Sequence, residues 1–269
     1  MRNIRLALIF ALIVTSVLFG WMQMRKAISG QSDCPVLSCP EDVLEISVYQ
    51  DQTVLLNGVQ AFDDQDGDLT DQIMIAGVSK LISEDTAKVT YIVFDSDDNM
   101  SSCERLVRYR DYHRPRIYAD EALVYSSMNV INLGKGLRAQ DSLDGNLSEQ
   151  IRVSTLNSTE ESDVYRIVAQ VTNSMGDNRR VELPVIIQSD DEARPVIQLK
   201  TYIVYLDRGE EFSPKEYIRS VSDYRQSYSV SNVEILSDVD VDRPGNYWVK
   251  YQFIQDGKIS KAILTVVVQ

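Results

Sequence analysis

Residues 61–78 read AFDDQDGDLTDQIMIAGV, and residues 139–156 read AQDSLDGNLSEQIRVSTL. The two stretches align without a gap at a spacing of 78 residues. They share an Asp-x-x-Asp-Gly core, with Asp63 opposite Asp141 and Asp66 opposite Asp144. Agreement of this density over 18 positions indicates an internal repeat, which is the sequence signature of tandem structural units.

The repeats begin and end in the same way. Arg-Pro occurs at residues 114–115 and again at 194–195, each time before a short apolar run, so these dipeptides mark the junctions. Each repeat closes with two alternating runs, the first of which reads KVTYIVFD, YRIVAQVT or GNYWVKYQF, separated by Asp, Asn or Gly turn residues. Alternation rich in Val, Ile, Tyr and Thr predicts half-buried strands, and such turns join them into hairpins.

A period near 78 residues with about seven short strands predicts an immunoglobulin-like β-sandwich. We place repeat 1 at residues 34–112, repeat 2 at 113–190 and a divergent repeat 3 at 191–269. A unit of this size can bury its own core, so we expect separate beads on a string. Repeat 3 has Val221-Ser222-Asp223-Tyr224 where the others have Asp-Gly, so we expect its middle strands to be remodelled; residues 212–220 predict one short helical turn.

The N-terminal segment has a different character. Residues 6–24, LALIFALIVTSVLFGWMQM, are 19 residues without a charge, enough for a helix to cross a hydrocarbon core of ~30 Å. A cleaved signal peptide is the alternative, but its best site, Ala27-Ile28-Ser29, would follow Arg25 and Lys26. We predict an uncleaved anchor within residues 1–30. The predicted fold is therefore all-β, with three tandem immunoglobulin-like β-sandwiches after one N-terminal transmembrane helix, in the cell membrane with the C-terminal region extracytoplasmic.

The charge of the chain limits its partners. Lys and Arg number 27 against 40 Asp and Glu, for a formal net charge of −13. An acidic surface repels nucleic acid and anionic lipid headgroups, so we expect no nucleic-acid partner and membrane contact only through the N-terminal helix. The sequence does not say which protein or glycan would be the ligand.

Several motifs carry a resemblance to a known group. Gly58-Val59, Asp63 and Asp66-Gly67-Asp68-Leu69-Thr70 in repeat 1, with Pro244-Gly245-Asn246-Tyr247 in repeat 3, resemble the tandem Ig-like repeats of bacterial cell-surface proteins. The same domain is also found appended to pesticidal crystal toxins. The resemblance implies a structural or adhesive role and covers the chain from Cys34 to its end.

Repeat 1 is also similar to the hyalin repeat, in which a Cys-Pro near the first strand pairs with a Cys after an Asp-x-x-Gly-Asn turn. That resemblance implies a disulfide between Cys39 and Cys103. A bridge over a loop of this length is worth about 4 kcal/mol in chain-entropy estimates. The third cysteine is Cys34, whose state stays open.

The acidic run Asp63–Asp68 has two interpretations. Closely spaced oxygen ligands suit Ca²⁺, which would be held by Asp64, Asp66 and Asp68. The alternative, which we favour, is a tight turn whose carboxylates accept backbone N–H groups. An EF-hand is excluded because Ile75 stands where the bidentate Glu would be. We expect no other cofactor.

Nothing in the sequence indicates catalysis. The only histidine, His113, lies in the Tyr-His-Arg-Pro linker, which seldom forms the pocket that a catalytic triad needs. We therefore expect no enzyme but a membrane-anchored cell-surface structural or adhesive protein. The alternative is an accessory or sensor ectodomain of a cell-envelope complex, and an envelope hydrolase is the least favoured reading. Tyrosines gather in repeat 3 either for strand packing or as an exposed aromatic patch: Tyr202, Tyr205, Tyr217, Tyr224 and Tyr228.

Overall fold

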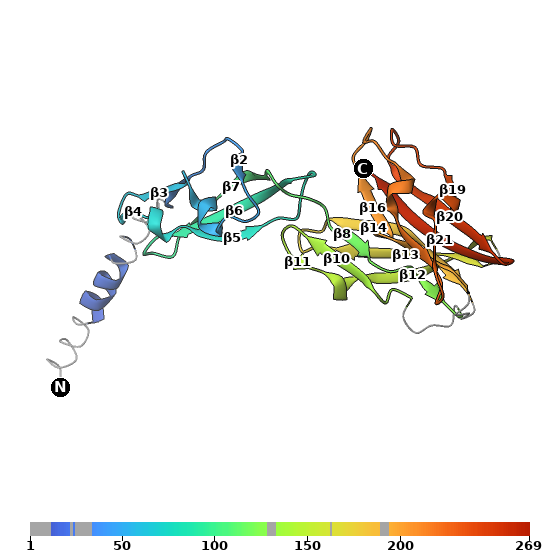
Figure 1. The fold of residues 1–269 in the computed structure, drawn as a ribbon. Helices are drawn as coiled ribbons and strands as arrows, with labels where there is room; N and C mark the ends of the chain where they lie inside the picture. The colour runs from blue at the N-terminus through green and yellow to red at the C-terminus, as the bar shows by residue number, and fades with distance from the viewer. Residues whose placement is uncertain (1–11, 22–23, 25–33, 128–132, 162, 189–193) are drawn as a thin grey trace. The chain divides into compact units, whose positions relative to one another are not determined.

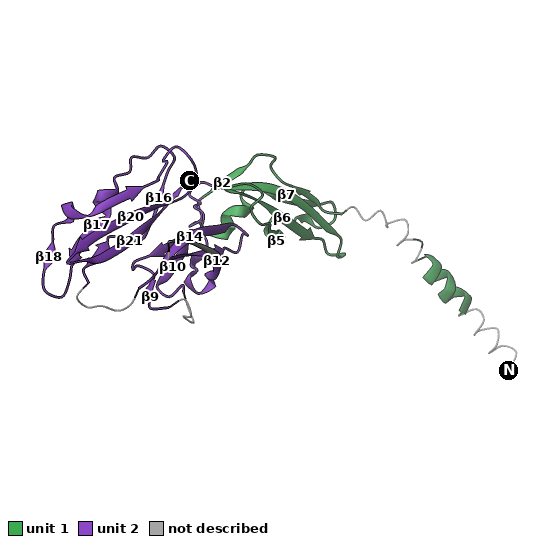
Figure 2. Ribbon diagram, turned by 90° about the vertical axis from the view of Figure 1, so that its right-hand side faces the viewer, with its two compact units in different colours: residues 1–46, 50–108 green, residues 47–49, 109–269 purple. Residues whose placement is uncertain are grey.

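The computed structural model describes residues 12–21, 24, 34–127, 133–161, 163–188 and 194–269 (Figure 1). The chain divides into two compact units (Figure 2). Unit 1 comprises Met1–Ile46 and Gln50–Arg108, and unit 2 comprises Ser47–Tyr49 and Tyr109–Gln269. Unit 1 therefore holds repeat 1 apart from residues 47–49 and 109–112, and unit 2 holds those residues together with repeats 2 and 3.

The N-terminal segment is only partly described. Residues 12–21 are helical. Across the described residues, no helix has both the length and the apolar character that a membrane crossing requires. The predicted anchor at residues 6–24 extends into residues 1–11 and 22–23, which lie outside the described part of the chain. The anchor stays a prediction.

Repeat 1 forms one three-stranded and one four-stranded sheet. The first contains, in spatial order, β1 (Val36–Ser38), β3 (Gln60–Asp63) and β4 (Gly67–Asp68). The second contains β2 (Leu44–Ile46), β7 (Met100–Tyr109), β6 (Thr86–Phe94) and β5 (Met74–Val78). Alternation along β6 buries Ala87, Val89, Tyr91 and Val93 completely between the sheets. Tyr91 donates from its hydroxyl to the carbonyl of Leu55, which ties the short 3-10 helix η1 (Gln52–Leu56) to this core.

Repeats 2 and 3 keep the same plan of three plus four strands. In repeat 2 the sheets are β11-β10-β8 and β12-β13-β14-β9. Their bounds are Arg116–Ala119 (β8), Val124–Tyr125 (β9), Leu137–Asp141 (β10), Gly145–Asn146 (β11), Arg152–Glu161 (β12), Val164–Thr172 (β13) and Asn178–Ile187 (β14). In repeat 3 the sheets are β15-β17-β18 and β16-β21-β20-β19. Their bounds are Val196–Leu199 (β15), Ile203–Leu206 (β16), Ile218–Ser222 (β17), Ser227–Tyr228 (β18), Glu234–Ser237 (β19), Gly245–Gln255 (β20) and Lys258–Val268 (β21).

The local elements agree with the sequence patterns. The predicted hairpin of repeat 3 is β20–β21, closed by Asp256 at φ 50° and Gly257 at φ 75°. Two consecutive positive φ angles are what a two-residue hairpin turn requires, which explains the Asp-Gly pair. The predicted helical turn within residues 212–220 is the 3-10 helix η4 (Pro214–Tyr217). The all-β architecture of paired sheets is confirmed.

Repeat 3 differs from our expectation because its middle strands are not remodelled. Asp223 accepts hydrogen bonds from the backbone N–H groups of Arg225 and Gln226 at 2.7 and 2.8 Å. Asp63 makes the same pair of contacts in repeat 1. The aspartate contact is therefore kept in repeat 3, where Ser227 stands in the place of Gly67 and Gly145.

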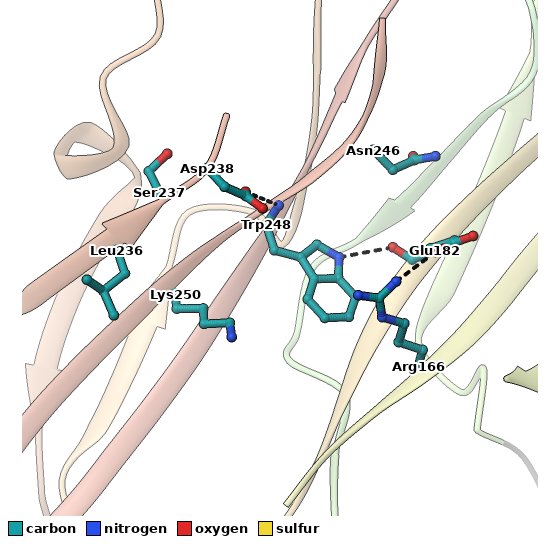
Figure 3. Close-up of a pocket in the computed structure, with 8 residues that line it drawn as sticks. All are labelled: Arg166, Glu182, Leu236, Ser237, Asp238, Asn246, Trp248 and Lys250. Carbon is teal, nitrogen blue, oxygen red and sulfur yellow. Dashed lines mark hydrogen bonds and ion pairs between the residues drawn. The ribbon is translucent and has the colours of Figure 1, made fainter. Parts of the chain in front are cut away.

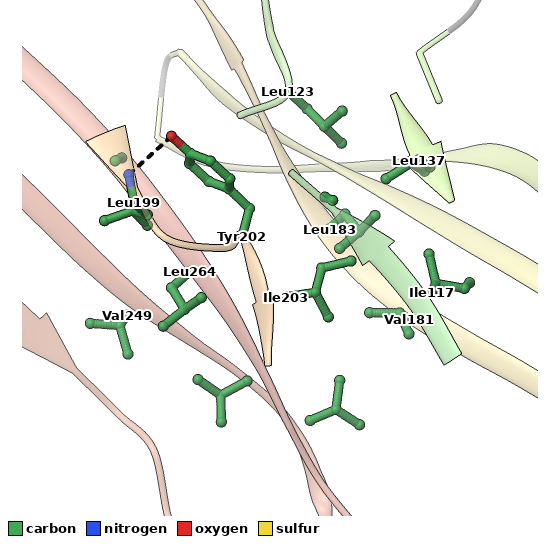
Figure 4. Close-up of a cluster of buried hydrophobic side chains, with 14 of the residues drawn as sticks. Ile117, Leu123, Leu137, Val181, Leu183, Leu199, Tyr202, Ile203, Val249 and Leu264 are labelled. Atoms are coloured by element: carbon green, nitrogen blue, oxygen red, sulfur yellow. Dashed lines mark hydrogen bonds between the residues drawn. The ribbon is translucent and has the colours of Figure 1, made fainter. Parts of the chain in front are cut away.

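Repeats 2 and 3 also differ from the expected string of separate beads. One continuous cluster of buried apolar side chains runs through both repeats (Figure 4). Side chains of repeat 2 such as Ile117 and Leu183 belong to the same cluster as Leu199, Ile203 and Leu264 of repeat 3. Size alone predicted an independent core for each repeat, but burial of a second face against a neighbour removes further apolar surface from water.

Candidate functional site at the junction of repeats 2 and 3

The aspartate turns recur in all three repeats and are structural. Asp63 and Asp141 are both buried, and each accepts two backbone N–H groups through one carboxylate oxygen, at 2.8–3.0 Å. The second oxygen of Asp141 accepts from the side-chain amide of Asn173 at 3.2 Å. A buried carboxylate needs such partners, because an unsatisfied one is costly.

In repeats 1 and 2 a second aspartate joins the turn to the neighbouring hairpin, whereas repeat 3 has Gln226 at that position. Asp66 accepts from the backbone N–H and the hydroxyl of Ser96 at 2.7 and 2.9 Å. Asp144 makes the same two contacts with Ser174. Thirty residues of chain separate each pair, so the aspartates hold two turns together at one end of each sandwich.

The calcium interpretation therefore meets competition from hydrogen bonds. Asp66 is occupied by Ser96, and Asp68 accepts the backbone N–H of Thr70 at 2.9 Å. In the described part of the chain, no three His, Cys, Asp or Glu side chains come together as a set that could hold a metal ion. The turn interpretation accounts for these contacts, and calcium binding by Asp64, Asp66 and Asp68 stays a prediction for titration.

The linker ahead of repeat 2, which contains Tyr112 and His113, is hydrogen-bonded to two turns of that repeat. The hydroxyl of Tyr112 donates to Asp177 at 2.8 Å and accepts from Asn173 at 2.8 Å. Burial, together with the hydrogen bond to Asp177, raises the pKa of the Tyr112 phenol. His113 is exposed, and its backbone N–H and carbonyl both bond to the hydroxyl of Ser142. His113 therefore contributes its backbone N–H and carbonyl to this linker contact.

The predicted disulfide is present in unit 1. Cys39 and Cys103 are bonded, with a Cα–Cα distance of 6.1 Å across a sequence separation of 64 residues. Cys34 is a free, exposed thiol. The bridge links the start of the repeat to strand β7.

Tyr205 joins repeats 2 and 3. Its hydroxyl donates to the carbonyl of Ile117 at 3.0 Å and accepts the backbone N–H of Ile117 at 2.8 Å. The guanidinium groups of Arg116 and Arg179 lie 5.2 and 5.3 Å from its ring centre, within cation–π range. Burial raises the pKa of Tyr205 to about 12. Tyr205 thus links β16 of repeat 3 to β8 of repeat 2 through two hydrogen bonds.

Trp248 forms a second contact between the two repeats (Figure 3). It stands on β20 and is only 8% exposed. Its indole N–H donates to the carbonyl of Glu182 on β14 at 3.3 Å. The guanidinium of Arg166, on β13, lies 4.8 Å from the centre of the ring and pairs with the Glu182 carboxylate at 3.5 Å. The ring also joins Val164, Ile186 and Ile263 in a small apolar cluster that draws on both repeats.

A pocket of about 340 Å³ opens beside Trp248. Figure 3 shows side chains of both repeats around it: Arg166, Glu182, Leu236, Ser237, Asp238, Asn246, Trp248 and Lys250. This volume lies at the lower end of the range typical of small-ligand sites, roughly 300–1,000 Å³. The lining carries two cations and two carboxylates, so it is close to neutral although the chain as a whole is strongly acidic.

Most of the charged groups at the pocket already have structural partners. Asp238 accepts the backbone N–H of Trp248 at 3.1 Å, and Glu182 pairs with both Arg166 and Arg180 at 3.5 Å. These contacts hold the charged side chains of the pocket in place, so they can orient a bound ligand. Asn246 and Ser237 add an amide and a hydroxyl that can exchange hydrogen bonds with a ligand.

Sequence reasoning missed this site. Trp248 and Asn246 lay within a stretch that matched a strand pattern, and nothing in the alternation distinguishes a core tryptophan from one that contacts a neighbouring repeat. Of the tyrosine cluster, Tyr202 is buried and Tyr205, Tyr217 and Tyr228 pack against the shared core, whereas Tyr224 is 61% exposed. The packing interpretation holds for the first four.

No protein-family model matches this chain. It is similar to the pesticidal crystal protein Cry22Aa of Bacillus thuringiensis, with 32% identity over 131 residues. The match covers 44% of this chain and 16% of the toxin, so the chain spans a small part of that protein's length. The resemblance to repeats appended to crystal toxins is thereby confirmed as a weak similarity, and the hyalin resemblance stays a prediction.

Solved structures resemble the chain only loosely. The M60 catalytic domain with CBM51 domains from Clostridium perfringens ZmpB has a TM-score of 0.25 at 14% identity, covering 87% of this chain and 30% of that one. Human CDH23 EC21-23 has a TM-score of 0.22 at 13% identity, covering 87% of this chain and 99% of that one. Scores this low carry no argument about function.

Proposed function

We propose that this chain is a non-catalytic cell-surface protein, anchored in the membrane by residues 6–24, in which repeats 2 and 3 act together as a ligand-binding head. The pocket beside Trp248 carries the proposal, because its lining comes from both repeats and the shared core fixes those side chains relative to one another. The acidic body and the tandem repeats support a surface role.

The chemistry of the pocket supports binding rather than catalysis. A nucleophile or general base needs a partner that activates it and room to reach a substrate atom. The two carboxylates of this pocket are instead held by a backbone N–H and by two guanidinium groups. Those contacts orient the lining without leaving either carboxylate poised beside a nucleophile.

The balanced charge and mixed donors favour a neutral ligand rich in hydroxyl groups. Asn246, Ser237 and Lys250 offer donors and acceptors around one volume, next to the edge of an indole ring. A saccharide exchanges many such hydrogen bonds through its hydroxyl groups. We therefore propose a glycan as the ligand of the head.

The test measures binding of the full chain, in detergent, to a panel of soluble neutral oligosaccharides by isothermal titration. Asn246→Ala and Lys250→Ala alter the pocket without removing the Trp248 contacts between the repeats. We expect each to weaken glycan binding by about tenfold, in line with the loss of one hydrogen bond to a ligand. Thr172→Ala, an exposed position on repeat 2 away from the junction, is the control.

Two results would overturn parts of the proposal. Binding that is unchanged in both pocket variants would place the glycan elsewhere. No binding to any glycan, together with stable co-purification of other envelope proteins from solubilised membranes, would favour the accessory or sensor ectodomain. The anchor is tested separately: the chain should stay in the membrane pellet after a high-pH wash, and deletion of residues 6–24 should release it.

A further inference from the structure

The outer face of the four-stranded sheet of repeat 1 carries a group of exposed apolar side chains. Met74 lies opposite Ile92, and Phe94 lies opposite Met100. Ile92 and Phe94 are two residues apart on β6, so all four side chains point to the same face. Met74 is 49% exposed, Phe94 38% and Met100 52%, and Ile92 between them is half-buried. We call these four residues the apolar patch.

Repeat 2 provides an internal control for the apolar patch. At the spacing of 78 residues the four equivalent positions are Arg152, Gln170, Thr172 and Asn178, which are all polar and exposed. Their strand pairing is the same, with Arg152 opposite Gln170 and Thr172 opposite Asn178. The sandwich therefore does not need apolar residues at these positions. Clustered exposed apolar side chains indicate a contact surface.

The charges around the apolar patch narrow the choice of occupant. On the same face, Lys88 and Glu104 neutralise one another at 2.9 Å. Beyond Phe94, the turn into β7 carries Asp95, Asp97 and Asp98. These carboxylates oppose an anionic lipid surface. The neutral face beside them lets a like-charged second copy approach over apolar contacts.

The position of the apolar patch in the chain also favours a second copy. Val36, in β1 of the same repeat, is separated from Met24 by eleven residues, a reach of at most about 40 Å. Copies anchored through residues 6–24 would hold this surface near the membrane at similar heights. Four side chains are far fewer than the roughly 20–30 residues per side of a standard interface, so the contact needs the concentrating effect of a common membrane.

We infer that two copies of this chain pair through their apolar patches, in a two-fold arrangement that sets one patch against the other. The contact rests on the proposed anchor for its strength. It makes the surface protein a dimer whose binding heads are brought in pairs to a ligand.

The experiment places a photo-crosslinking amino acid at Met100 of the full chain in membranes. Irradiation should give a product at twice the mass of the 30.5 kDa chain. The matched control replaces Asn178, the equivalent exposed position of repeat 2, and should give at most a small fraction of that product. Membrane pelleting is read from the same samples, so failure of the anchor is seen separately from failure of the contact.

A graft then tests the apolar patch itself. With the crosslinker at position 100, Met74→Arg, Ile92→Gln and Phe94→Thr install the residues of repeat 2, and the dimer product should fall at least fivefold. Protection of Cys39 and Cys103 from alkylation shows that the grafted repeat still folds. Raising the salt concentration should increase the dimer product, because it screens the turn carboxylates.

Several outcomes would overturn the inference. Equal products from positions 100 and 178, no dimer product at position 100, or a product of another mass would each do so. A dimer product that survives the graft but is lost with Val36→Arg and Phe62→Gln would place the contact on the opposite sheet. A product of another mass that weakens with salt would point to a basic partner protein instead.

Discussion

One aspartate in each repeat holds a turn between two strands of the three-stranded sheet. Asp63, Asp141 and Asp223 occupy equivalent turns, and each gathers two backbone N–H groups on one oxygen. The contact satisfies donors that have no strand partner, so the turn forms with or without the following glycine. In this protein the acidic motif therefore indicates a turn whose backbone N–H groups need an acceptor, and not in the first place a metal site.

The contribution of Asp63 to stability can be measured against that of its neighbour Asp64. Asp63→Ala removes a buried acceptor from the N–H groups of Gln65 and Asp66 and should lower the free energy of unfolding by roughly 2–3 kcal/mol. Asp64→Ala, at an exposed position one residue away, should change it by less than about 0.5 kcal/mol. Urea denaturation of both variants is the measurement. Equal losses would show that the turn does not depend on Asp63.

Calcium should leave repeat 1 unaffected. A ligand that binds only the folded state stabilises it by RT ln(1 + [L]/Kd), so a site with a dissociation constant well below about 1 mM would raise the melting temperature at that Ca²⁺ concentration. Because Asp66 and Asp68 already accept backbone N–H groups, we expect no shift and no heat of binding. A rise in melting temperature that is absent from the Asp66→Asn variant would establish the calcium site.

Tyr205 predicts how alkali affects unit 2. The unfolded phenol ionises near pH 10, whereas burial raises the folded pKa to about 12. The unfolded state therefore loses its proton first as the pH rises, and the stabilisation present below pH 10 declines between about pH 10 and 12, by about 2–3 kcal/mol. Tyr205→Phe should be less stable at neutral pH, having lost both bonds to Ile117, and should show a shallower decline with pH. Thermal melts across this range provide the comparison.

Strands and turns were the level at which the sequence was most informative. Alternation in β6, β13 and β20 predicted half-buried strands, and the spacing of 78 residues predicted their recurrence. The junction could not be predicted in the same way. Tyr205 and Trp248 read as ordinary strand residues, because alternation records which face is buried and not which neighbour covers it. The pocket depends on that neighbour, so it became visible only in the folded arrangement.

The disulfide should stabilise one unit and leave the other unchanged. Cys39→Ser with Cys103→Ser removes the bridge from unit 1 and should lower the stability of that unit by about 2–4 kcal/mol. Unit 2 holds no cysteine in its described part, so its melting should not respond. Differential scanning calorimetry of the wild-type chain with and without reductant gives the same contrast. A shift in both transitions would contradict the division into independent units.

At the scale of the whole molecule, the number of folding units differs from the number of repeats. Repeats 2 and 3 share a core and are joined by Tyr205, by Trp248 and by an ion pair of Lys261 with Asp163 at 3.0 Å. We expect two calorimetric transitions from the three repeats. Ile203→Ala, in the shared core, should lower the free energy of unfolding of unit 2 by about 2–5 kcal/mol. The melting temperatures of both repeats should therefore fall together. Three resolved transitions, or a shift confined to repeat 3, would contradict this.

The shared core also bears on how such a chain can change over evolutionary time. A gene segment of one repeat was the unit of duplication, as the period of 78 residues shows. A bead that buries its own core can be copied, lost or shuffled freely. Loss of repeat 3 here would remove more than half of the buried cluster to which Ile117 and Leu183 belong, and would expose apolar surface of repeat 2 to water. We therefore expect exchange of repeat 2 or repeat 3 alone to lower stability, whereas repeat 1, with its own disulfide, can be exchanged without opening that core.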